Sequence, residues 1–291
     1  MTTLVLGANG QVGTHLRECL PDAVFWTREQ ADLFAPTEVE DRVLAEKPSV
    51  IVNAAAYTAV DRAEEETDLA WTVNAEAPAA LARAARELDA ILVHFSTDYV
   101  FDGAKAGPYL DTEPTRPQSA YGATKLAGEL AVATLCPKHW IFRTSWVFSE
   151  HGGNFVKTML RLGGERDELG VVDDQTGRPT YAGHIASAVA EVIGMSKGQA
   201  LPWGVYHLTG GKPVSWCTFA REIFRRAGDR GLMSSRPSVK AITTDDYPTP
   251  AKRPANSVLQ PSAALREQLS ALPDWETGLD TVLAMIEAGS G

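Results

Sequence analysis

The chain has 291 residues, enough for one large domain or two modest ones around a sizeable core. Its composition, 44% hydrophobic and 22% charged, is that of a globular protein rather than a disordered one. The formal net charge of −10 argues against a nucleic-acid-binding surface, which requires clustered basic residues, and no apolar run approaches the roughly 18 residues that span a bilayer.

The cysteines and the N-terminal residues indicate a compartment. Cys19, Cys136 and Cys217 lie far apart without paired spacing, which is typical of free thiols in a reducing environment and not of a disulfide framework or a metal site. The first residues, MTTLVLGANG, lack the basic flank and small-residue cleavage site of a signal peptide. We therefore expect a cytoplasmic protein that binds neither nucleic acid nor membranes.

The first half of the chain alternates short apolar runs with helical patterns. In chain order, strands are expected at 3–7, 23–26, 49–56, 90–96 and 139–145, and helices at 11–20, about 36–47, about 67–88 and from about 119. Strands that alternate with helices in this way form βαβ units. The sequence therefore predicts an α/β fold with a Rossmann-like, doubly wound parallel sheet that is covered on both faces.

After Trp146 this alternation ends, and glycine pairs and a proline cluster separate shorter elements. We expect a dinucleotide-binding Rossmann domain over residues 1–148, with a return segment near 171–196. Residues 149–170 and 197–291 are expected to form a smaller α/β substrate-binding region.

The segment GANGQVG directly follows the first expected strand and begins the first helix. Gly7, Gly10 and Gly13 have the spacing GxxGxxG, which permits a tight turn, a close approach of a pyrophosphate to the backbone and its reception by the helix N-terminus. The motif predicts dinucleotide binding that also involves Gln11 and Val12. The alternative is a purely structural turn, because three glycines at such a position are common.

The end of the second strand decides which dinucleotide is bound, because an acidic residue there bonds a ribose 2′-hydroxyl whereas an arginine accommodates a 2′-phosphate. The sequence reads WTREQADL, with Arg28 at the expected place and Glu29 beside it. This pattern favours NADPH and leaves NADH open. It also leaves open that Arg28 is an ordinary solvated surface charge.

A phenol and an ammonium group lie four residues apart in the segment SAYGATKLAGE, residues 119–129. On a helix this spacing brings the side chains of Tyr121 and Lys125 onto one face, one turn apart. Either the pair belongs to an ordinary amphipathic surface, or the lysine changes the acidity of the tyrosine.

Four segments in order, GANGQVG, NAAAYTAVDRAE, STDYVFDG and YGATK, give the chain a resemblance to the extended short-chain dehydrogenases/reductases. It resembles the dTDP-4-dehydrorhamnose reductases more narrowly, because further segments match along nearly the whole chain: FRTSWVF, NFVKTMLRL, DQTGRPT, YHLTGG and YPTPAKRPANSVL. YxxxK alone is common by chance, whereas this ordered set is specific.

The resemblance implies three catalytic residues. Tyr121 would protonate the oxygen of a ketone whose carbon receives hydride from the nicotinamide. Lys125 would bond the nicotinamide ribose and lower the pKa of the tyrosine. Thr97 would orient and polarise the substrate oxygen, with the adjacent Ser96 as the alternative.

The resemblance also implies residues that bind the cofactor and the substrate. The cofactor side would include Ala54, Ala55, Ala56, Asp32 and Leu33. The substrate side, for a dTDP-linked keto-deoxysugar, would include Asp98, Tyr99, Trp146, Asn154 and Arg253. In this set the arginine would pair with a diphosphate, and the aromatic rings would face the sugar. The loop of Asp98 and Tyr99 could instead be held only by its own hydrogen bonds.

The six histidines have no metal-ligand spacing, so we expect no metal in catalysis. Some reductases of the resembled family pair their subunits through magnesium bound by glutamates, one of them just after the glycine loop. This chain has His15 there, and magnesium prefers carboxylate oxygens to imidazole. The resemblance therefore does not extend to a metal-bridged dimer, and we expect a monomer or a different homodimer.

The expected function is NADPH-dependent reduction of the 4-keto group of a dTDP-4-keto-6-deoxy-L-sugar, which gives dTDP-L-rhamnose or a close relative. One alternative is a nucleotide-sugar epimerase of the same superfamily, which would retain tightly bound NAD. The other is a non-catalytic regulatory subunit with the same fold.

Overall fold

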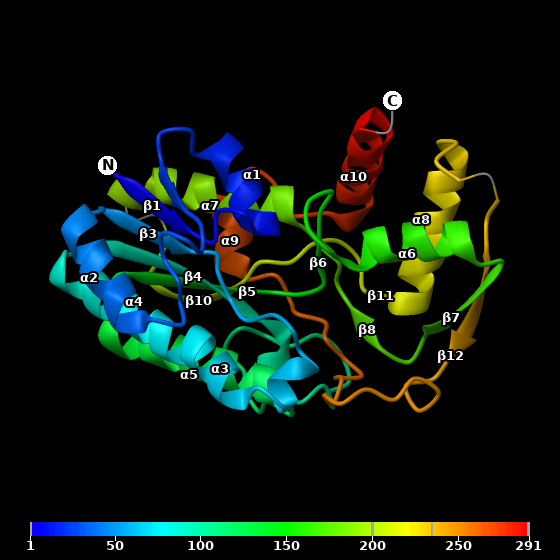
Figure 1. Cartoon of the computed structure of the whole chain (residues 1–291), viewed down its shortest axis with the longest axis horizontal. Coiled ribbons are helices and arrows are strands. Elements are labelled where there is room, and N and C mark those ends of the chain that lie inside the picture. The colour runs from blue at the N-terminus through cyan, green and yellow to red at the C-terminus, as the bar shows by residue number, and fades with distance from the viewer. Residues whose placement is uncertain (1, 199–200, 234, 290–291) are drawn as a thin grey trace.

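The computed structural model describes residues 2–198, 201–233 and 235–289 (Figure 1). In this part of the chain, the central sheet has six strands, all parallel, in the order β10-β5-β4-β3-β1-β2. They are β1 (Thr3–Leu6), β2 (Val24–Trp26), β3 (Val50–Asn53), β4 (Ile91–Thr97), β5 (His139–Thr144) and β10 (Gly204–His207). The strand order reverses between β1 and β3, which confirms the predicted doubly wound α/β fold.

Helices cover both faces of this sheet (Figure 1). They are α1 (Gln11–Cys19), α2 (Pro36–Glu46), α4 (Ala77–Glu87), α5 (Ala120–Leu135), α7 (Ala182–Met195) and α9 (Ala263–Gln268). Leu4 and Leu6 pack with α2, α4 and α5 on one face, and Val5 between them packs with α1, α7 and α9 on the other. Because both faces are buried, β1 and β3 are mainly apolar instead of alternating, whereas β4 and β5 also carry buried polar side chains such as His94 and Arg143.

A smaller region lies beside the sheet and holds its own apolar core, which includes Phe148, Phe219 and Leu279 (Figure 1). Its helices are α6 (Phe155–Glu165), α8 (Trp216–Asp229) and α10 (Trp275–Gly289). Its strands are β6 (Val147–Phe148), β7 (Glu168–Val172), β8 (Thr176–Gly177), β9 (Thr180–Tyr181), β11 (Val214–Ser215) and β12 (Ser238–Ile242), paired as β6–β9, β7–β12 and β8–β11. Short 3-10 turns occur at Arg62–Glu64, Asp98–Val100 and Ser196–Gly198.

Three parts of the chain differ from the predicted division. The helix α9 packs on the main sheet, and β8 and β9, within the predicted return segment near 171–196, pair with strands of the smaller region. The third is β10. The range 197–291 was expected to lie in the smaller region, but β10 pairs with β5 as an edge strand of the main sheet. The sequence of β10, GVYH, is too short for its pattern to predict a strand. Its position in the sheet depends on pairing with β5, which lies about 60 residues earlier in the chain. Residues 199–200, 234 and 290–291 of that predicted range lie outside the described residues.

The helix expected at 67–88 is interrupted. It consists of α3 (Thr67–Trp71), a π-helical turn at Thr72–Glu76 and α4. Pro78 has no N–H to donate to the carbonyl of Asn74 four residues earlier, so the regular ladder cannot continue there. The Asn74 side chain accepts a hydrogen bond from Tyr57 N at 2.9 Å and donates to Thr124 Oγ1 at 3.2 Å. The irregular turn thus joins α5 to the loop after β3.

Two glycines let α5 approach its neighbours closely. A Cβ atom on Gly122 would lie 2.3 Å from the carbonyl oxygen of Tyr99, and one on Gly128 would lie 2.1 Å from that of Asn74. The N-terminus of α5 is capped by Ser119, whose hydroxyl accepts from Gly122 N at 3.1 Å. These contacts fix the depth and the starting point of the helix that carries Tyr121 and Lys125.

The three cysteines are free, and the thiols of Cys136 and Cys217 are buried. Among the described residues, no helix combines the length and the apolar character that a membrane span requires.

The close approach of α5 is tested by Gly128→Ala. Its added methyl group would collide with the backbone of the π-helical turn, so we expect the free energy of unfolding to fall by about 1–3 kcal/mol. Gly164→Ala is the matched control, because Gly164 is exposed in α6 and its Cβ would meet nothing within 4 Å. Urea unfolding of both variants checks this, and equal stability of the two would contradict it.

Candidate active site

The glycine turn between β1 and α1 lies against the end of β3. Gly7 has a positive φ of +81°, and a Cβ there would lie 2.6 Å from the backbone of Ala54. A Cβ on Gly13 would lie 2.1 Å from the carbonyl oxygen of Gly7, so the turn tolerates no side chain at either position. Gly10 is the N-cap of α1 and supplies no side-chain cap, which leaves N–H groups of the first turn free to meet an anion.

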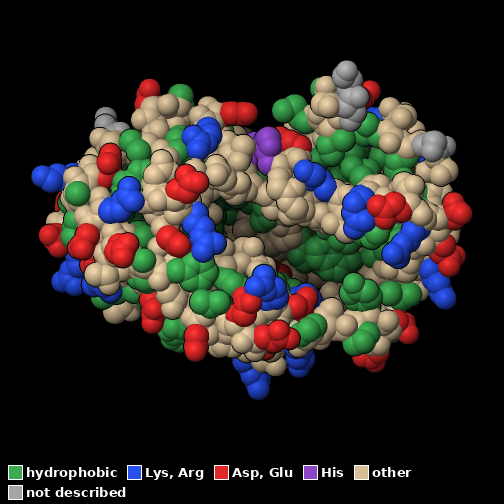
Figure 2. Space-filling view, viewed as in Figure 1, with side chains coloured by type: hydrophobic (Ala, Val, Ile, Leu, Met, Phe, Trp, Pro, Cys, Tyr) green, Lys and Arg blue, Asp and Glu red, His purple; other side chains and the backbone are tan. Residues whose placement is uncertain are grey.

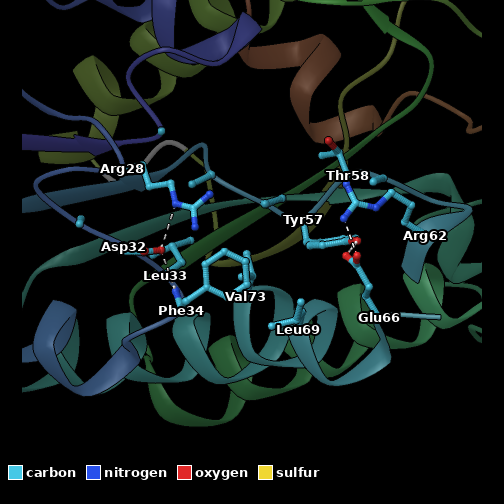
Figure 3. A pocket seen from close by; sticks show the side chains of 15 residues that line it. Arg28, Asp32, Leu33, Phe34, Tyr57, Thr58, Arg62, Glu66, Leu69 and Val73 are labelled. Atoms are coloured by element: carbon cyan, nitrogen blue, oxygen red, sulfur yellow. Dashed lines mark hydrogen bonds and ion pairs between the residues drawn. The ribbon is translucent and has the colours of Figure 1, made fainter. Parts of the chain in front are cut away.

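A cavity of about 420 Å³ opens beside this turn, at the carboxyl ends of β1, β2 and β3 (Figure 3). The predicted cofactor residues that line it are Gly7, Arg28, Asp32, Leu33, Ala55 and Ala56. Ala54 lies against Gly7 as described. Gly10, Gln11, Val12 and Gly13 form the turn and the start of α1 and are not part of the lining. Most of the predicted set therefore converges on one place.

Arg28 stands on the wall of this cavity with its side chain 73% exposed. Its Nε lies 3.4 Å from Asp32 Oδ1, and its guanidinium lies 4.8 Å from the centre of the Phe34 ring (Figure 3). The carboxylate and the ring orient the guanidinium without neutralising all of its donors. A cation that remains free to bind is thus available beside the mouth of the cavity.

The opposite wall of the cavity was not predicted from the sequence. The hydroxyl of Tyr57 donates to Glu66, and Arg62 forms an ion pair with the same carboxylate (Figure 3). The hydrogen bond to Glu66 raises the pKa of the Tyr57 phenol. These residues belong to the segment NAAAYTAVDRAE and the acidic stretch after it. No local sequence pattern there indicates which side chains line a cavity.

The predicted catalytic side chains meet where the N-terminus of α5 packs on the end of β4. Lys125 is almost completely buried, and its Nζ donates to the carbonyl oxygen of Phe95 at 2.7 Å. Burial lowers the pKa of Lys125 to about 8, and the negative charge of Glu129 opposes this shift. The hydrogen bond to Phe95 holds the amine against the end of β4.

The lowering of the Tyr121 pKa by Lys125 is not found in this structure. Burial raises the pKa of the phenol above its usual value, and the interaction with the Thr97 hydroxyl opposes that shift. The nearby Asp98 and Tyr99 raise it further. The reason is physical: a phenol removed from water resists ionisation unless a cation faces its oxygen, and here the lysine amine is directed to a backbone carbonyl.

Thr97, rather than Ser96, faces the tyrosine. Thr97 Oγ1 interacts with Tyr121, donates to Asp98 Oδ1 at 2.9 Å and accepts from Tyr99 N at 3.2 Å. Successive side chains of a strand point to opposite faces, so Ser96 is directed away from Tyr121. The Ser96 hydroxyl is buried and has no hydrogen-bond partner among the described residues.

Asp98 and Tyr99 continue the group. Asp98 is buried, which raises the pKa of its carboxyl to about 6 in spite of hydrogen bonds from Ser257 and Thr97. The ring of Tyr99 lies edge-on to that of Tyr121, with the ring centres 5.5 Å apart. Burial raises the pKa of Tyr99 to about 12. The phenol of Tyr121 is therefore enclosed on this side by an aromatic edge.

A larger cavity, of about 660 Å³, lies between the sheet and the smaller region, and Figure 2 shows the surface hollowed between the two lobes. Tyr99 and Arg253, both predicted to bind substrate, are part of its lining. Arg253 Nη1 lies 3.3 Å from Tyr99 Oη, and Arg253 Nη2 pairs with Asp61 Oδ2 at 2.6 Å. Asp61 also lines the cavity, although the sequence alone gave no reason to single it out.

Three residues predicted to bind substrate do not line this cavity: Asp98, which is buried beside Thr97, Trp146 and Asn154. Trp146 stacks on Trp216, which does line it, with ring centres 3.4 Å apart. Asn154 is the N-cap of α6, where its side chain accepts from Lys157 N. It also donates to Gln11 Oε1 at 3.1 Å, across the seam between the two lobes. Trp146 lies behind the wall of the cavity, and Asn154 holds the lobes together.

The fold and the site together define a short-chain dehydrogenase/reductase of the extended type. A family model described as the RmlD substrate binding domain matches residues 1–288. The chain is 46% identical to a dTDP-4-dehydrorhamnose reductase of Burkholderia thailandensis, over 94% of this chain and 95% of that relative. It is 41% identical to the Escherichia coli reductase of the same name, over 97% of each chain. The chain therefore belongs to the dTDP-4-dehydrorhamnose reductase family.

Solved structures give the same relationship. A dTDP-4-dehydrorhamnose reductase from Clostridium acetobutylicum is 38% identical and superposes with a TM-score of 0.90, covering 99% of this chain and 100% of that one. The Bacillus anthracis reductase, solved in complex with NADP, is 36% identical, with a TM-score of 0.90 and 98% and 99% coverage. A UDP-glucose 4-epimerase from Thermus thermophilus shares the fold, with a TM-score of 0.76, at 20% identity.

The buried carboxyl of Asp98 is expected to make stability depend on pH. Its pKa is about 6 in the folded chain and near 3.8 when exposed, so the folded state binds the extra proton between those values. As pH rises from about 4 to about 6, the wild type should lose stability relative to Asp98→Asn, by about 3 kcal/mol in total. Urea unfolding of both proteins across this range measures the difference, and a gap that stays constant with pH would contradict the prediction.

Proposed function

We propose that this protein uses NADPH to reduce the 4-keto group of a dTDP-4-keto-6-deoxy-L-sugar, dTDP-4-dehydro-L-rhamnose, to dTDP-L-rhamnose or a close relative. One observation carries the proposal: the hydroxyls of Thr97 and Tyr121 interact beside Tyr99, which lines the larger cavity, and the buried amine of Lys125 is held against Phe95 of the same strand as Thr97. The names of the relatives, and the NADP bound in the Bacillus anthracis structure, support the same reaction.

The glycine turn and the smaller cavity fit a dinucleotide. The pyrophosphate would meet the uncapped N-terminus of α1, and the adenosine part would fill the cavity beside Leu33. Arg28 would bond a 2′-phosphate, which favours NADPH over NADH. When bound, the cofactor supplies the hydride that reduces the carbonyl carbon of the substrate.

The protein's own groups would handle the proton. Tyr121 would donate its phenolic proton to the substrate oxygen as negative charge develops there, and the Thr97 hydroxyl would turn from Asp98 to donate a hydrogen bond to the same oxygen. The buried amine of Lys125 would bond the nicotinamide ribose, and its charge would stabilise the phenolate that remains. Burial raises the pKa of the phenol, so Tyr121 stays protonated in the free protein. The charge of Lys125 would stabilise the phenolate only after the proton has passed to the bound substrate.

The larger cavity would hold the sugar nucleotide. Arg253 would exchange its ion pair with Asp61 for the diphosphate, and Tyr99 and Trp216 would cover the apolar face of the deoxysugar. Trp146 would act through its stack on Trp216, and Asp98 by orienting Thr97. In this proposal residues 1–148 bind the cofactor, and the smaller region covers the substrate.

Tyr121→Phe is the direct test. Removal of the proton donor should lower kcat for dTDP-4-dehydro-L-rhamnose by about 10²- to 10⁴-fold, with the Kd for NADPH little changed. The matched control is Tyr206→Phe, because the Tyr206 hydroxyl donates to the carbonyl of Pro202 at the edge of the sheet, on β10. NADPH oxidation and cofactor fluorescence give the two readouts.

Unchanged turnover in Tyr121→Phe would refute the proposed catalysis. An epimerase would give a different pattern in the wild type: bound NAD after purification and no net consumption of NADPH. NMR of the sugar product would then report inversion of a stereocentre without reduction.

Arg28→Ala tests the choice of cofactor. The loss of a charged hydrogen bond to a 2′-phosphate should raise the KM for NADPH about 10- to 100-fold while leaving the KM for NADH nearly unchanged. Arg225→Ala controls for the loss of positive charge, since Arg225 pairs with Glu222 and Asp229 on α8. An equal rise in KM for NADPH and NADH would show that Arg28 does not bind a 2′-phosphate.

A further inference from the structure

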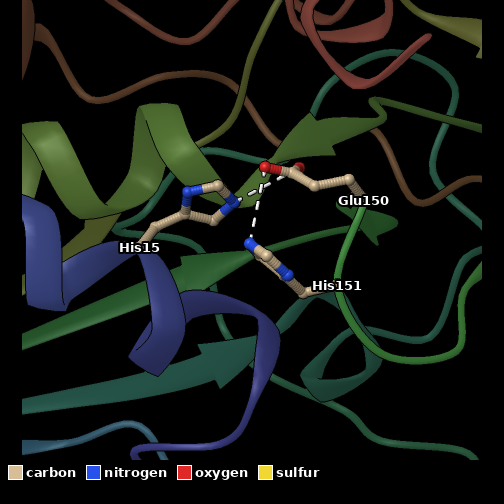
Figure 4. Close-up of side chains that lie close together, drawn as sticks. All are labelled: His15, Glu150 and His151. Carbon is tan, nitrogen blue, oxygen red and sulfur yellow. Dashed lines mark ion pairs between the residues drawn. The ribbon is translucent and has the colours of Figure 1, made fainter. Parts of the chain in front are cut away.

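Three potential metal ligands meet outside both cavities (Figure 4). His15 comes from α1, and Glu150 and His151 come from the loop between β6 and α6, far away in the sequence. His15 Nε2 lies 3.5 Å from Glu150 Oε2, and His151 Nε2 lies 3.6 Å from Glu150 Oε1. The ligand atoms all lie within 4.8 Å of one another.

We propose that His15, Glu150 and His151 bind a divalent transition-metal ion of the zinc type. Ligand bonds of about 2.0–2.1 Å in a tetrahedron place neighbouring ligand atoms about 3.4 Å apart. Each histidine Nε2 already lies at nearly this distance from a Glu150 oxygen, His15 from Oε2 and His151 from Oε1. The His151 side chain is 40% exposed, so it could rotate to bring its nitrogen closer to that of His15, and a water molecule would supply the fourth ligand.

The surroundings hold two of the ligands in place. The side chains of His15 and Glu150 are buried, and the Ser149 hydroxyl lies 3.1 Å from both His15 Nε2 and Glu150 Oε2. A metal ion would take the place of the serine hydroxyl on His15.

The composition of the site selects the ion. Two imidazoles and one carboxylate suit zinc, cobalt and nickel, whereas magnesium requires about six oxygen ligands. All three ligands belong to one chain, so the ion would not have to bridge subunits. It would instead join α1, which begins at the glycine turn, to the loop that enters α6 in the other lobe. The hydrogen bond from Asn154 to Gln11 crosses the same seam.

The test uses the full chain, freed of metal with a chelator and then titrated with Co²⁺ and Zn²⁺. We expect one Co²⁺ per chain with the visible absorption of a tetrahedral site, displacement by Zn²⁺ in calorimetry, a higher Tm with Zn²⁺ and no binding of Mg²⁺ at the same concentration. His151→Asn and Glu150→Gln should each weaken Zn²⁺ binding by at least about tenfold. These readouts do not depend on turnover, so they are independent of the proposed reaction.

The matched control is His184→Gln. His184 is half-buried nearby, its Nδ1 accepts from Asp274 N, and it is not among the three ligands. This variant should bind Zn²⁺ as the wild type does. If a variant of the buried His15 or Glu150 does not fold, His151→Asn decides the test, because the His151 side chain is 40% exposed and its loss costs little packing. The proposal is overturned if Co²⁺ does not bind stoichiometrically, if His151→Asn binds Zn²⁺ normally, or if His184→Gln alone abolishes binding.

Discussion

The close packing of α5 against the end of β4 is the constraint on which the site depends. Gly122 packs against the carbonyl of Tyr99, and Gly128 packs against the carbonyl of Asn74. A Cβ atom at either position would collide with that carbonyl oxygen. Because the helix lies this deep, its first turn brings Tyr121 to Thr97, and its second brings Lys125 to the carbonyl of Phe95. A helix one side-chain layer further out would leave the phenol without partners.

The same packing buries the charged groups of Lys125, Glu129 and Arg143 where α5 lies on the sheet. The Lys125 amine is offset by Glu129, which in turn bonds Arg143 through two nitrogens at 2.9 and 2.7 Å. The neighbouring His94 is buried as well, and its pKa falls well below the usual value because of burial and the lysine charge. Such groups cost desolvation energy and contribute little net stability, but each fixes the position and the charge of the next. The burial of these charges therefore adds little to the free energy of unfolding, but it holds Lys125 in place.

The two lobes are joined by polar contacts around the cavities rather than by one continuous apolar core. Arg253 reaches Asp61, Asn154 reaches Gln11, and Glu150 and His151 reach His15. The apolar clusters of the sheet and of the smaller region remain separate. Substrate and cofactor would bind where the lobes meet, so the contacts there can be exchanged for ligand contacts without breaking either core.

The sequence by itself determined the parallel sheet, the glycine turn and the spacing of Tyr121 and Lys125, because these depend on local periodicity and on residues a few positions apart. It also located the part of the smaller cavity that the glycine turn and the ends of β2 and β3 form, since the ends of parallel strands converge on one edge, but not the opposite wall around Tyr57 and Glu66. Only the tertiary structure decided where β10 pairs and that Arg253 forms an ion pair with Asp61. It also decided that burial raises the pKa of Tyr121 and that His15 lies close to Glu150 and His151. Those features depend on desolvation and on contacts between distant segments, which a linear pattern does not encode.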